Sequence, residues 1–210
     1  MKKLLSSLTL LSMTACGALA ADIWLVDLSC LDQLIGRPAE VAALRIGIPY
    51  GANPTITGLD IGVWGRSERA WGLQVNLFVN DVREKSGGAQ LAICNLGDDV
   101  TGIQLGLWNS TASLAGAQLG GLNYAENADF LQLGLANAAN TMKGLQLGGW
   151  NSAPNFTGLQ IGLVNTSQSV EGYQIGLLNR TDKMRGFQLG LINVITSSSL
   201  PVFPIFNCIF

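Results

Sequence analysis

The sequence predicts an all-β protein, a β-solenoid of about ten coils with fourteen residues in each coil. Two observations support this fold: a glutamine slot that recurs every fourteen residues, and an alternation of side-chain types around the slot with the period of a β-strand. Only the step between the slots at 74 and 90 is longer, at sixteen residues. The slot is filled at Asp60, Gln74, Gln90, Gln104, Gln118, Gln132, Gln146, Gln160, Gln174 and Gln188.

Residues 1–20 have the composition of an export signal. Two lysines precede the apolar stretch from Leu4 to Ala20, and Ala18-Leu19-Ala20 is a small-x-small cleavage site. The stretch Met13-Thr14-Ala15-Cys16 is an imperfect lipobox and offers a competing interpretation, in which Cys16 is lipidated and anchors the chain to a membrane. Both interpretations predict export.

Residues 21–57 and 197–210 lie outside the repeat and are expected to cap its two ends. A solenoid without caps exposes unpaired strand edges. We expect residues 21–57 to cover the first coil and residues 197–210 to form a cap strand on the last one.

Residues 58–196 form the repeat, which we number with the glutamine slot as zero. Slots −1, +1 and +3 are mostly aliphatic, as in Leu159, Ile161 and Leu163, while slot +2 is mostly glycine. This gives a strand with one apolar face, which we expect to form the core. Glutamines at slot 0 are expected to hydrogen-bond from coil to coil in a ladder.

The remaining slots describe the corners and the return leg of each coil. Slot +5 is asparagine in eight units and slot −2 is glycine in most, so both are expected at corners. Slot +10 is apolar in most units and should point inward from the return leg. Most charged residues lie in the return legs, including the long one at 80–88, which makes that side the solvated face.

An up-and-down β-barrel of the outer membrane is the alternative fold. The terminal aromatic residue Phe210 favours it. The period favours the solenoid instead, because a barrel has two kinds of turn and would repeat every two strands, or about 28 residues. Pro201 and Pro204 also weaken a membrane strand at this end.

The composition excludes several classes of function. The chain is 48% hydrophobic and 12% charged, and its net charge of −2 argues against a nucleic-acid partner. It contains no histidine, so it has no His-based triad and no His metal ligand; we predict no catalytic residue, no metal and no cofactor. We interpret Asp98 and Asp99 as solvated. Cleavage would leave three of the four cysteines, Cys30, Cys94 and Cys208, which is no disulfide framework.

Slot +4 is the candidate binding stripe, with Trp64, Trp108 and Trp150 as its most prominent members. Two interpretations are open. By strict alternation slot +4 shares the face of the glutamines, where an apolar stripe would mark a contact with a partner, a glycan or a membrane. Alternatively, the asparagine corner turns slot +4 into the edge of the core.

The chain resembles a leptospiral-type bacterial surface-repeat family. The resemblance is carried by the Arg-Ile-Gly-Ile-Pro-Tyr-Gly lead-in, by units such as Gly-Leu-Gln-Ile-Gly-Leu-Val-Asn at 158–165, and by the Pro-Val-Phe-Pro-Ile-Phe-Asn tail. It implies an exported, surface-exposed protein and no known catalytic residues.

We therefore expect a non-enzymatic structural or adhesion module at the cell surface, at the outer membrane or in the periplasm. Its expected partner is a surface or glycan ligand, and association with the outer membrane is a further expectation. A carbohydrate-processing β-helix enzyme is a third hypothesis, but it would need a cluster of acids on adjacent coils.

Overall fold

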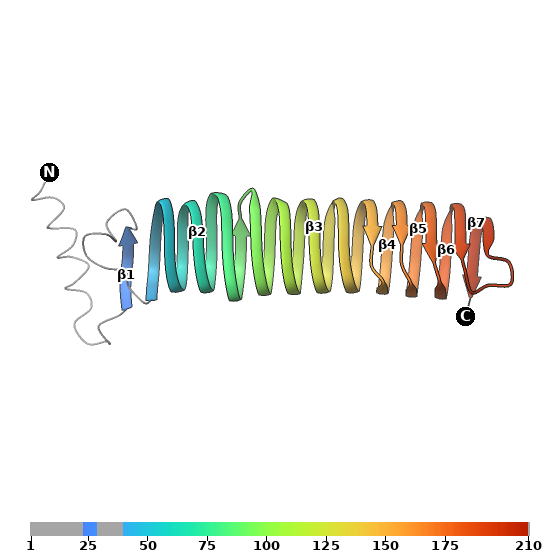
Figure 1. Cartoon of the computed structure of the whole chain (residues 1–210), viewed down its shortest axis with the longest axis horizontal. Coiled ribbons are helices and arrows are strands. Elements are labelled where there is room, and N and C mark those ends of the chain that lie inside the picture. Colours follow the sequence, from blue (N-terminus) through green and yellow to red (C-terminus); the bar gives the residue numbers. More distant parts are fainter. Residues whose placement is uncertain (1–22, 29–39, 210) are drawn as a thin grey trace, which may run out of the picture. The chain divides into compact units, whose positions relative to one another are not determined.

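The computed structural model describes residues 23–28 and 40–209, and it confirms the β-solenoid. The chain forms stacked parallel coils, about eleven turns in all (Figure 1). Two of the assigned strands run through several coils without a break. The strands are β1 (Ile23–Leu28), β2 (Glu40–Leu91), β3 (Cys94–Ser152), β4 (Asn155–Thr166), β5 (Ser169–Thr181), β6 (Lys183–Ile195) and β7 (Val202–Ile209). The predicted export signal, Cys16, Cys30 and Phe210 lie outside the described residues.

The chain divides into two compact units, Met1–Asp98 (unit 1) and Asp99–Phe210 (unit 2). The described part of unit 1 comprises β1, β2 and the start of β3. Unit 2 comprises the rest of β3 and the strands β4 to β7, and it contains the seven coils whose glutamine slots run from Gln104 to Gln188.

Successive coils pair in parallel with a register of fourteen residues. Gln146 lies opposite Gln160, Gln160 opposite Gln174, and Gln174 opposite Gln188. Like residues are therefore neighbours along the stack, as the sequence period predicts. The up-and-down barrel alternative is wrong, because its neighbouring strands would be antiparallel.

The final strand, β7, pairs with β6 in the antiparallel direction and covers the edge of the last coil. Its proline, Pro204, falls at a register shift between Gly190 and Asn193, where the ladder does not need its missing N–H. Asn207 lies opposite Gln188 and so continues the slot 0 column into β7. Gln188 Oε1 and Asn207 Nδ2, an acceptor and a donor, are both buried there without a partner.

The coiled part of unit 1 begins earlier than residue 58. β2 is continuous from Glu40, so residues 40–57 belong to a coil although the sequence led us to expect a cap there. β1 pairs in parallel with the start of β2 and places Asp27 opposite Arg45. The long return leg at 80–88 is accommodated within β2, and Gln90 still donates a hydrogen bond to Gln74.

The apolar core of unit 2 comes from the return legs. Its buried side chains occupy slots +7 and +10 of successive coils, and both slots point inward because the return leg faces the glutamine strand. The members of this cluster are Val100, Leu114, Ala125, Ala128, Ala139, Met142, Ala153, Phe156, Val170, Met184 and Ile195. The inward orientation predicted for slot +10 is thus observed.

Glycine at slot −2 is required by the backbone of the corner. Gly172 has a φ of 142°, and a Cβ atom there would collide with the carbonyl oxygen of Gly158 in the preceding coil. In one coil of unit 2 this slot holds Phe130, with a φ of 112° and a side chain that is 69% exposed. That residue holds a backbone conformation that disfavours side chains.

We expect Gly172→Ala to destabilise unit 2 by about 2 kcal/mol or more, because it adds both backbone strain and a collision. The reverse change at the same slot, Phe130→Gly, should stabilise the protein by relieving strain. Gly149→Ala is the matched control, since a Cβ atom at Gly149 would meet only the carbonyl oxygen of Leu135, at 3.0 Å. Urea denaturation followed by circular dichroism measures all three. Equal effects of the two glycine substitutions would contradict this account.

Candidate functional site

The glutamines at slot 0 of unit 2 form a ladder inside the coil. Each Nε2 donates to the Oε1 of the glutamine one coil earlier, at 2.7–2.9 Å, from Gln118→Gln104 through to Gln188→Gln174. All seven side chains are fully buried. Because each amide in the ladder finds its partner in the identical residue of the next coil, burying the glutamines leaves few polar atoms unsatisfied.

The slot +5 asparagines form a second buried ladder that runs in the opposite sense. Here Nδ2 donates to the Oδ1 of the asparagine one coil later, at 2.8–2.9 Å, from Asn109→Asn123 through to Asn179→Asn193. The same Nδ2 donates to the slot +1 backbone carbonyl of the later coil, at 2.8–3.1 Å. The asparagines therefore stabilise the corner and fix the register between successive coils.

The two ladders show that the two faces of the strand are reversed relative to the sequence-based prediction. Glutamine points inward and the aliphatic residues at slots −1, +1 and +3 point outward. Slot +2 also points inward: a Cβ atom at Gly162 would meet the Asn151 Nδ2 and the Asn165 Oδ1. Only glycine leaves room there for the asparagine ladder. The prediction that the aliphatic face forms the core is wrong.

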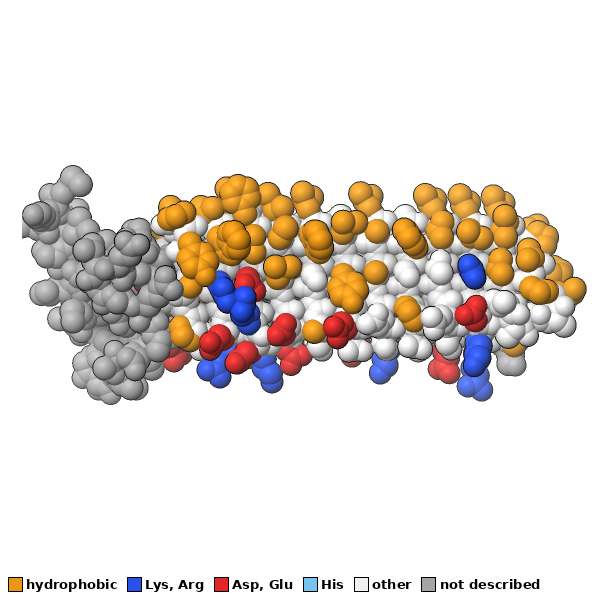
Figure 2. Space-filling model, in the orientation of Figure 1, with side chains coloured by type: hydrophobic (Ala, Val, Ile, Leu, Met, Phe, Trp, Pro, Cys, Tyr) orange, Lys and Arg blue, Asp and Glu red, His pale blue; other side chains and the backbone are white. Residues whose placement is uncertain are grey.

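This inversion leaves an aliphatic face on the surface of unit 2, defined by slots −1, +1, +3 and +4 of its seven coils. None of these positions is charged. Slot +3 protrudes most, with Leu107 67%, Leu135 77%, Leu163 59%, Leu177 52% and Leu191 66% exposed. Figure 2 shows hydrophobic side chains along one side of the coils and charged ones toward the opposite side.

A shallow groove runs along the aliphatic face between the rows at slots +1 and +3. Its volume is about 840 Å³, it spans five coils, and its floor is the glycine backbone of slot +2. The residues around it are Leu119, Gly120, Leu133, Gly134, Leu135, Leu147, Gly148, Gly149, Ile161, Gly162, Leu163, Ile175, Gly176 and Leu177.

The three predicted stripe tryptophans are exposed. Trp64 in unit 1 is 48% exposed and stacks edge-on with Tyr50; in unit 2, Trp108 and Trp150 are 53% and 58% exposed. Slots +3 and +4 both point outward because strict alternation breaks at slot +3, which the register of successive coils leaves out. The interpretation that places slot +4 in the core edge is therefore wrong. Leu122 and Ala136 separate Trp108 from Trp150, so these two rings form no continuous aromatic platform.

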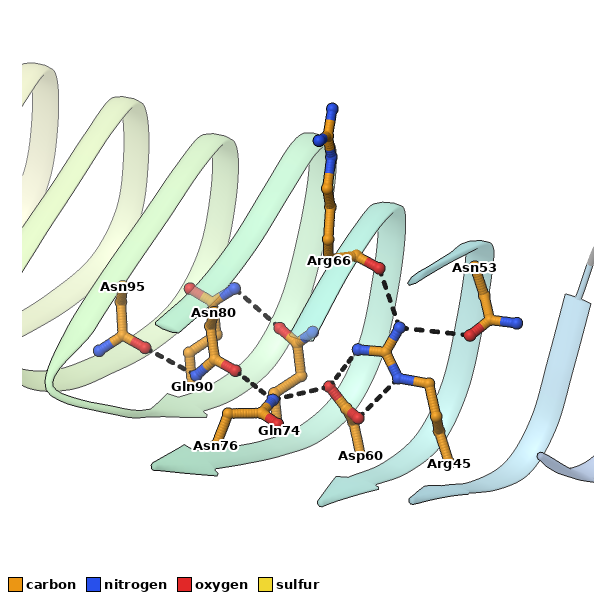
Figure 3. Close-up of polar contacts among 9 residues, drawn as sticks. All are labelled: Arg45, Asn53, Asp60, Arg66, Gln74, Asn76, Asn80, Gln90 and Asn95. Carbon is orange, nitrogen blue, oxygen red and sulfur yellow. Dashed lines mark hydrogen bonds and ion pairs between the residues drawn. The ribbon is translucent and has the colours of Figure 1, made fainter. Parts of the chain in front are cut away.

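A buried ion pair replaces the glutamine ladder at the start of unit 1 (Figure 3). Arg45 Nε and Nη2 donate to the two carboxylate oxygens of Asp60, at 2.7 and 2.6 Å, and both side chains are fully buried. Arg45 Nη1 also donates to the carbonyl oxygen of Arg66 at 2.9 Å and to Asn53 at 3.3 Å. The guanidinium group thus occupies slot 0 as the neighbour of Asp60.

Asparagine amides extend this network along unit 1. Asn76 Nδ2 donates to Asp60 at 2.9 Å and to Asn80 at 2.6 Å, and Asn80 donates to Asn95 at 2.8 Å (Figure 3). Gly65 stands where later coils have asparagine, and a Cβ atom there would approach both Arg45 and Asp60. Polar contacts therefore continue from the ion pair to the asparagines.

The described residues bring together no set of groups suited to metal chemistry. No cluster of three or more His, Cys, Asp or Glu side chains occurs among them. Asp98 and Asp99 are exposed on a return leg. Cys94 is half-buried and Cys208 exposed, and both are free thiols. The part of the chain described here also has no helix with the length and apolarity of a membrane span.

These features define a class of protein: a β-solenoid with amide ladders inside and an aliphatic sheet face outside. No family model, no curated protein and no solved structure matches the chain. The resemblance to surface-repeat proteins thus stays a prediction.

Sequence reasoning missed the buried ion pair and the outward aliphatic face. The signal for the ion pair was Asp60, the one acidic residue in a column of amides, which calls for a cation beside it. The signal for the outward face was that slots 0, +2 and +5 keep nearly the same residue type from coil to coil. Side chains that fit one another in a narrow interior tolerate less variation than those on a surface.

Proposed function

We propose that this protein is an exported, non-enzymatic repeat protein of the bacterial cell surface that acts as a structural or adhesion module through its aliphatic face. The observation that carries the proposal is the face itself. Seven successive coils carry leucine, isoleucine, valine, aromatic and small residues at the slots of this face without a single charge, and all of them except Ala117 are at least partly exposed. Large exposed apolar patches on proteins mark contact surfaces.

The interior of the solenoid supports a structural role. The ladders tie each coil to the next through side chains as well as through the backbone, so the aliphatic side chains are not needed to hold the coil together. They remain available for contact with another surface. The strand register pairs slots −1, +1, +2 and +4 of the face from coil to coil, so covering the face buries backbone that is mostly paired already.

Export is the second part of the proposal. The signal-like residues 1–20 support it, and the resemblance favours a location at the surface, the outer membrane or the periplasm of a bacterium with an outer membrane. The absence of histidine is in keeping with a role that requires no catalytic group.

The test is to express the full chain in a bacterium with an outer membrane. We compare the wild type with a face variant, Leu135→Lys, Leu163→Lys and Leu191→Lys, and with a return-leg variant, Asn140→Lys, Thr157→Lys and Gln168→Lys. The substituted residues of both variants are exposed, and both variants add three charges. Antibody labelling of intact cells reports export, and the fraction retained on the envelope after washing reports contact.

We expect wild type and return-leg variant to be labelled on intact cells and retained on the envelope. Retention of the face variant should fall about tenfold or more, because each buried leucine contributes roughly 2 kcal/mol to a contact. Wild-type protein held in the cytoplasm with residues 1–20 uncleaved would contradict export. Equal retention of the face variant and the wild type would contradict the role of the face.

A further inference from the structure

We propose that the partner of the aliphatic face is a second copy of this chain, related by a two-fold axis parallel to the direction in which the coils of unit 2 stack. The inference rests on the proposed function in one respect only, that the aliphatic face is a contact surface. It identifies the occupant of that surface.

The aliphatic face of unit 2 carries both a ridge and a groove. Leucine at slot +3 forms the ridge in five of the seven coils, with 52–77% of each side chain exposed. The residues at slot +1 form a lower row; Leu105, Leu133 and Leu189, for example, are 40–44% exposed. Between the two rows lies the groove floored by the glycines of slot +2.

Ridge and groove fit each other when the face meets a copy of itself. A two-fold axis along the stack reverses the direction of each strand but keeps the order of the coils. Slot +3 of each copy then lies over slot +2 of the other, and the fit is reciprocal, as in an isologous dimer. Leucine side chains interdigitate across such an interface as they do between paired β-sheets.

The repeat distance along the face is the same in both copies. Successive coils of both copies are spaced by the same strand separation, about 4.8 Å, so the fit made at one coil recurs at each of the five coils that carry leucine at slot +3. A partner without this spacing would lose register within a few coils. A second copy has the spacing by construction.

The charge of unit 2 and the contact area also bear on the nature of the partner. Unit 2 carries five acidic and four basic residues, for a net charge of −1, and so lacks the basic rim that attracts an anionic membrane. When slot +3 lies over slot +2, slots +1 to +4 of the two copies are in contact. Seven coils at about 4.8 Å and four strand positions at about 3.3 Å give a flat contact of roughly 440 Å² on each copy. Two copies would bury roughly 900 Å² by this flat measure, to which the protruding leucines add, and a specific interface is expected to bury roughly 1,000 Å².

The test is the mass of the purified full chain in solution, measured by sedimentation equilibrium with and without lipid vesicles. We expect wild type and return-leg variant to be dimers of the 22.2 kDa chain. The face variant should be a monomer with an unchanged circular dichroism spectrum. Wild-type monomers that bind phosphatidylcholine vesicles would overturn the proposal in favour of a lipid partner, and monomers that bind no vesicles would overturn it as well.

Cross-linking tests the orientation of the two copies. Leu191 lies three coils from the centre of the seven, and Leu191→Cys is introduced with Cys16, Cys30, Cys94 and Cys208 changed to serine. The proposed axis places the two introduced thiols across one sheet-to-sheet distance of about 10 Å, within reach of a short bismaleimide. An antiparallel arrangement separates them by about 29 Å, six strand spacings. We expect covalent dimers, and none from Gln168→Cys; a dimer that Leu191→Cys does not cross-link would overturn the two-fold axis.

The two proposals can fail separately. A monomer in solution whose face variant is still lost from the envelope would refute the dimer and leave the proposed function standing. A dimer in solution whose face variant is retained like the wild type would refute the role of the face at the cell surface and leave the dimer standing.

Discussion

Replacing Arg45 by methionine is expected to destabilise the first coils of unit 1 by about 3–5 kcal/mol, the cost of leaving one partner of a buried ion pair without the other. Asp60 would lose both of its N–H donors from the guanidinium group and stay fully buried. Hydrogen exchange of the amides of β2 measures the loss coil by coil. Unchanged protection next to Asp60 would contradict the prediction.

Two further variants test whether this loss of stability arises because the ion pair is buried. Glu84→Ala removes one partner of the pair Arg69–Glu84, whose side chains are about half exposed, and should change stability by less than about 1 kcal/mol. The double variant Arg45→Gln with Asp60→Gln should recover most of the loss, because neutral amides extend the ladder. The amide introduced at position 60 would offer an acceptor to Gln74 Nε2, which is buried without a partner in the structure.

Replacing Gln146 by methionine is expected to destabilise unit 2 by about 2–5 kcal/mol. Methionine is similar in size, so the loss comes from hydrogen bonds. Gln132 Oε1 would lose its donor and Gln160 Nε2 its acceptor, and each buried unsatisfied group costs about 1–3 kcal/mol.

The chain offers a matched control for that substitution. Gln168 lies exposed on a return leg, so Gln168→Met makes the same chemical change outside the ladder and should have an effect within about 0.5 kcal/mol. Denaturation followed by circular dichroism compares the two. If the two variants were equally stable, the ladder would contribute no net stability.

The sequence predicted the fold because every coil repeats the same local rules. The fourteen-residue period, the corners at slots −2 and +5, the inward slot +10 and the glutamine ladder can all be read from residue types and their spacing. The parallel register of Gln146, Gln160 and Gln174 follows directly from that period.

The orientation of the strand could not be predicted from alternation alone. Alternation separates two faces, and the usual rule that apolar residues lie inside chose the wrong one. In this coil the return leg already supplies the apolar part of the core, through residues such as Met142 and Phe156. The amides of slots 0 and +5 satisfy one another, which removes the usual penalty for burying them.

The pairing of Arg45 with Asp60 could not be predicted for a related reason. It lies fifteen residues before Asp60, whereas the repeat predicts a neighbour fourteen residues away. A single added residue in the first coil therefore hid the pairing. The three tryptophans were correctly singled out as prominent, but only the structure could place them on the surface.

The opposite senses of the two ladders have an electrostatic consequence. An aligned column of amides adds its dipoles head to tail, as the peptide groups of a helix do. In unit 2 the glutamine column directs its positive end toward the first coil, and the asparagine column directs its positive end toward the last. The two columns lie in the same interior and largely cancel, so adding or removing a whole coil leaves no growing dipole. Such a chain can change its length by duplication or loss of single coils without an electrostatic penalty at its ends.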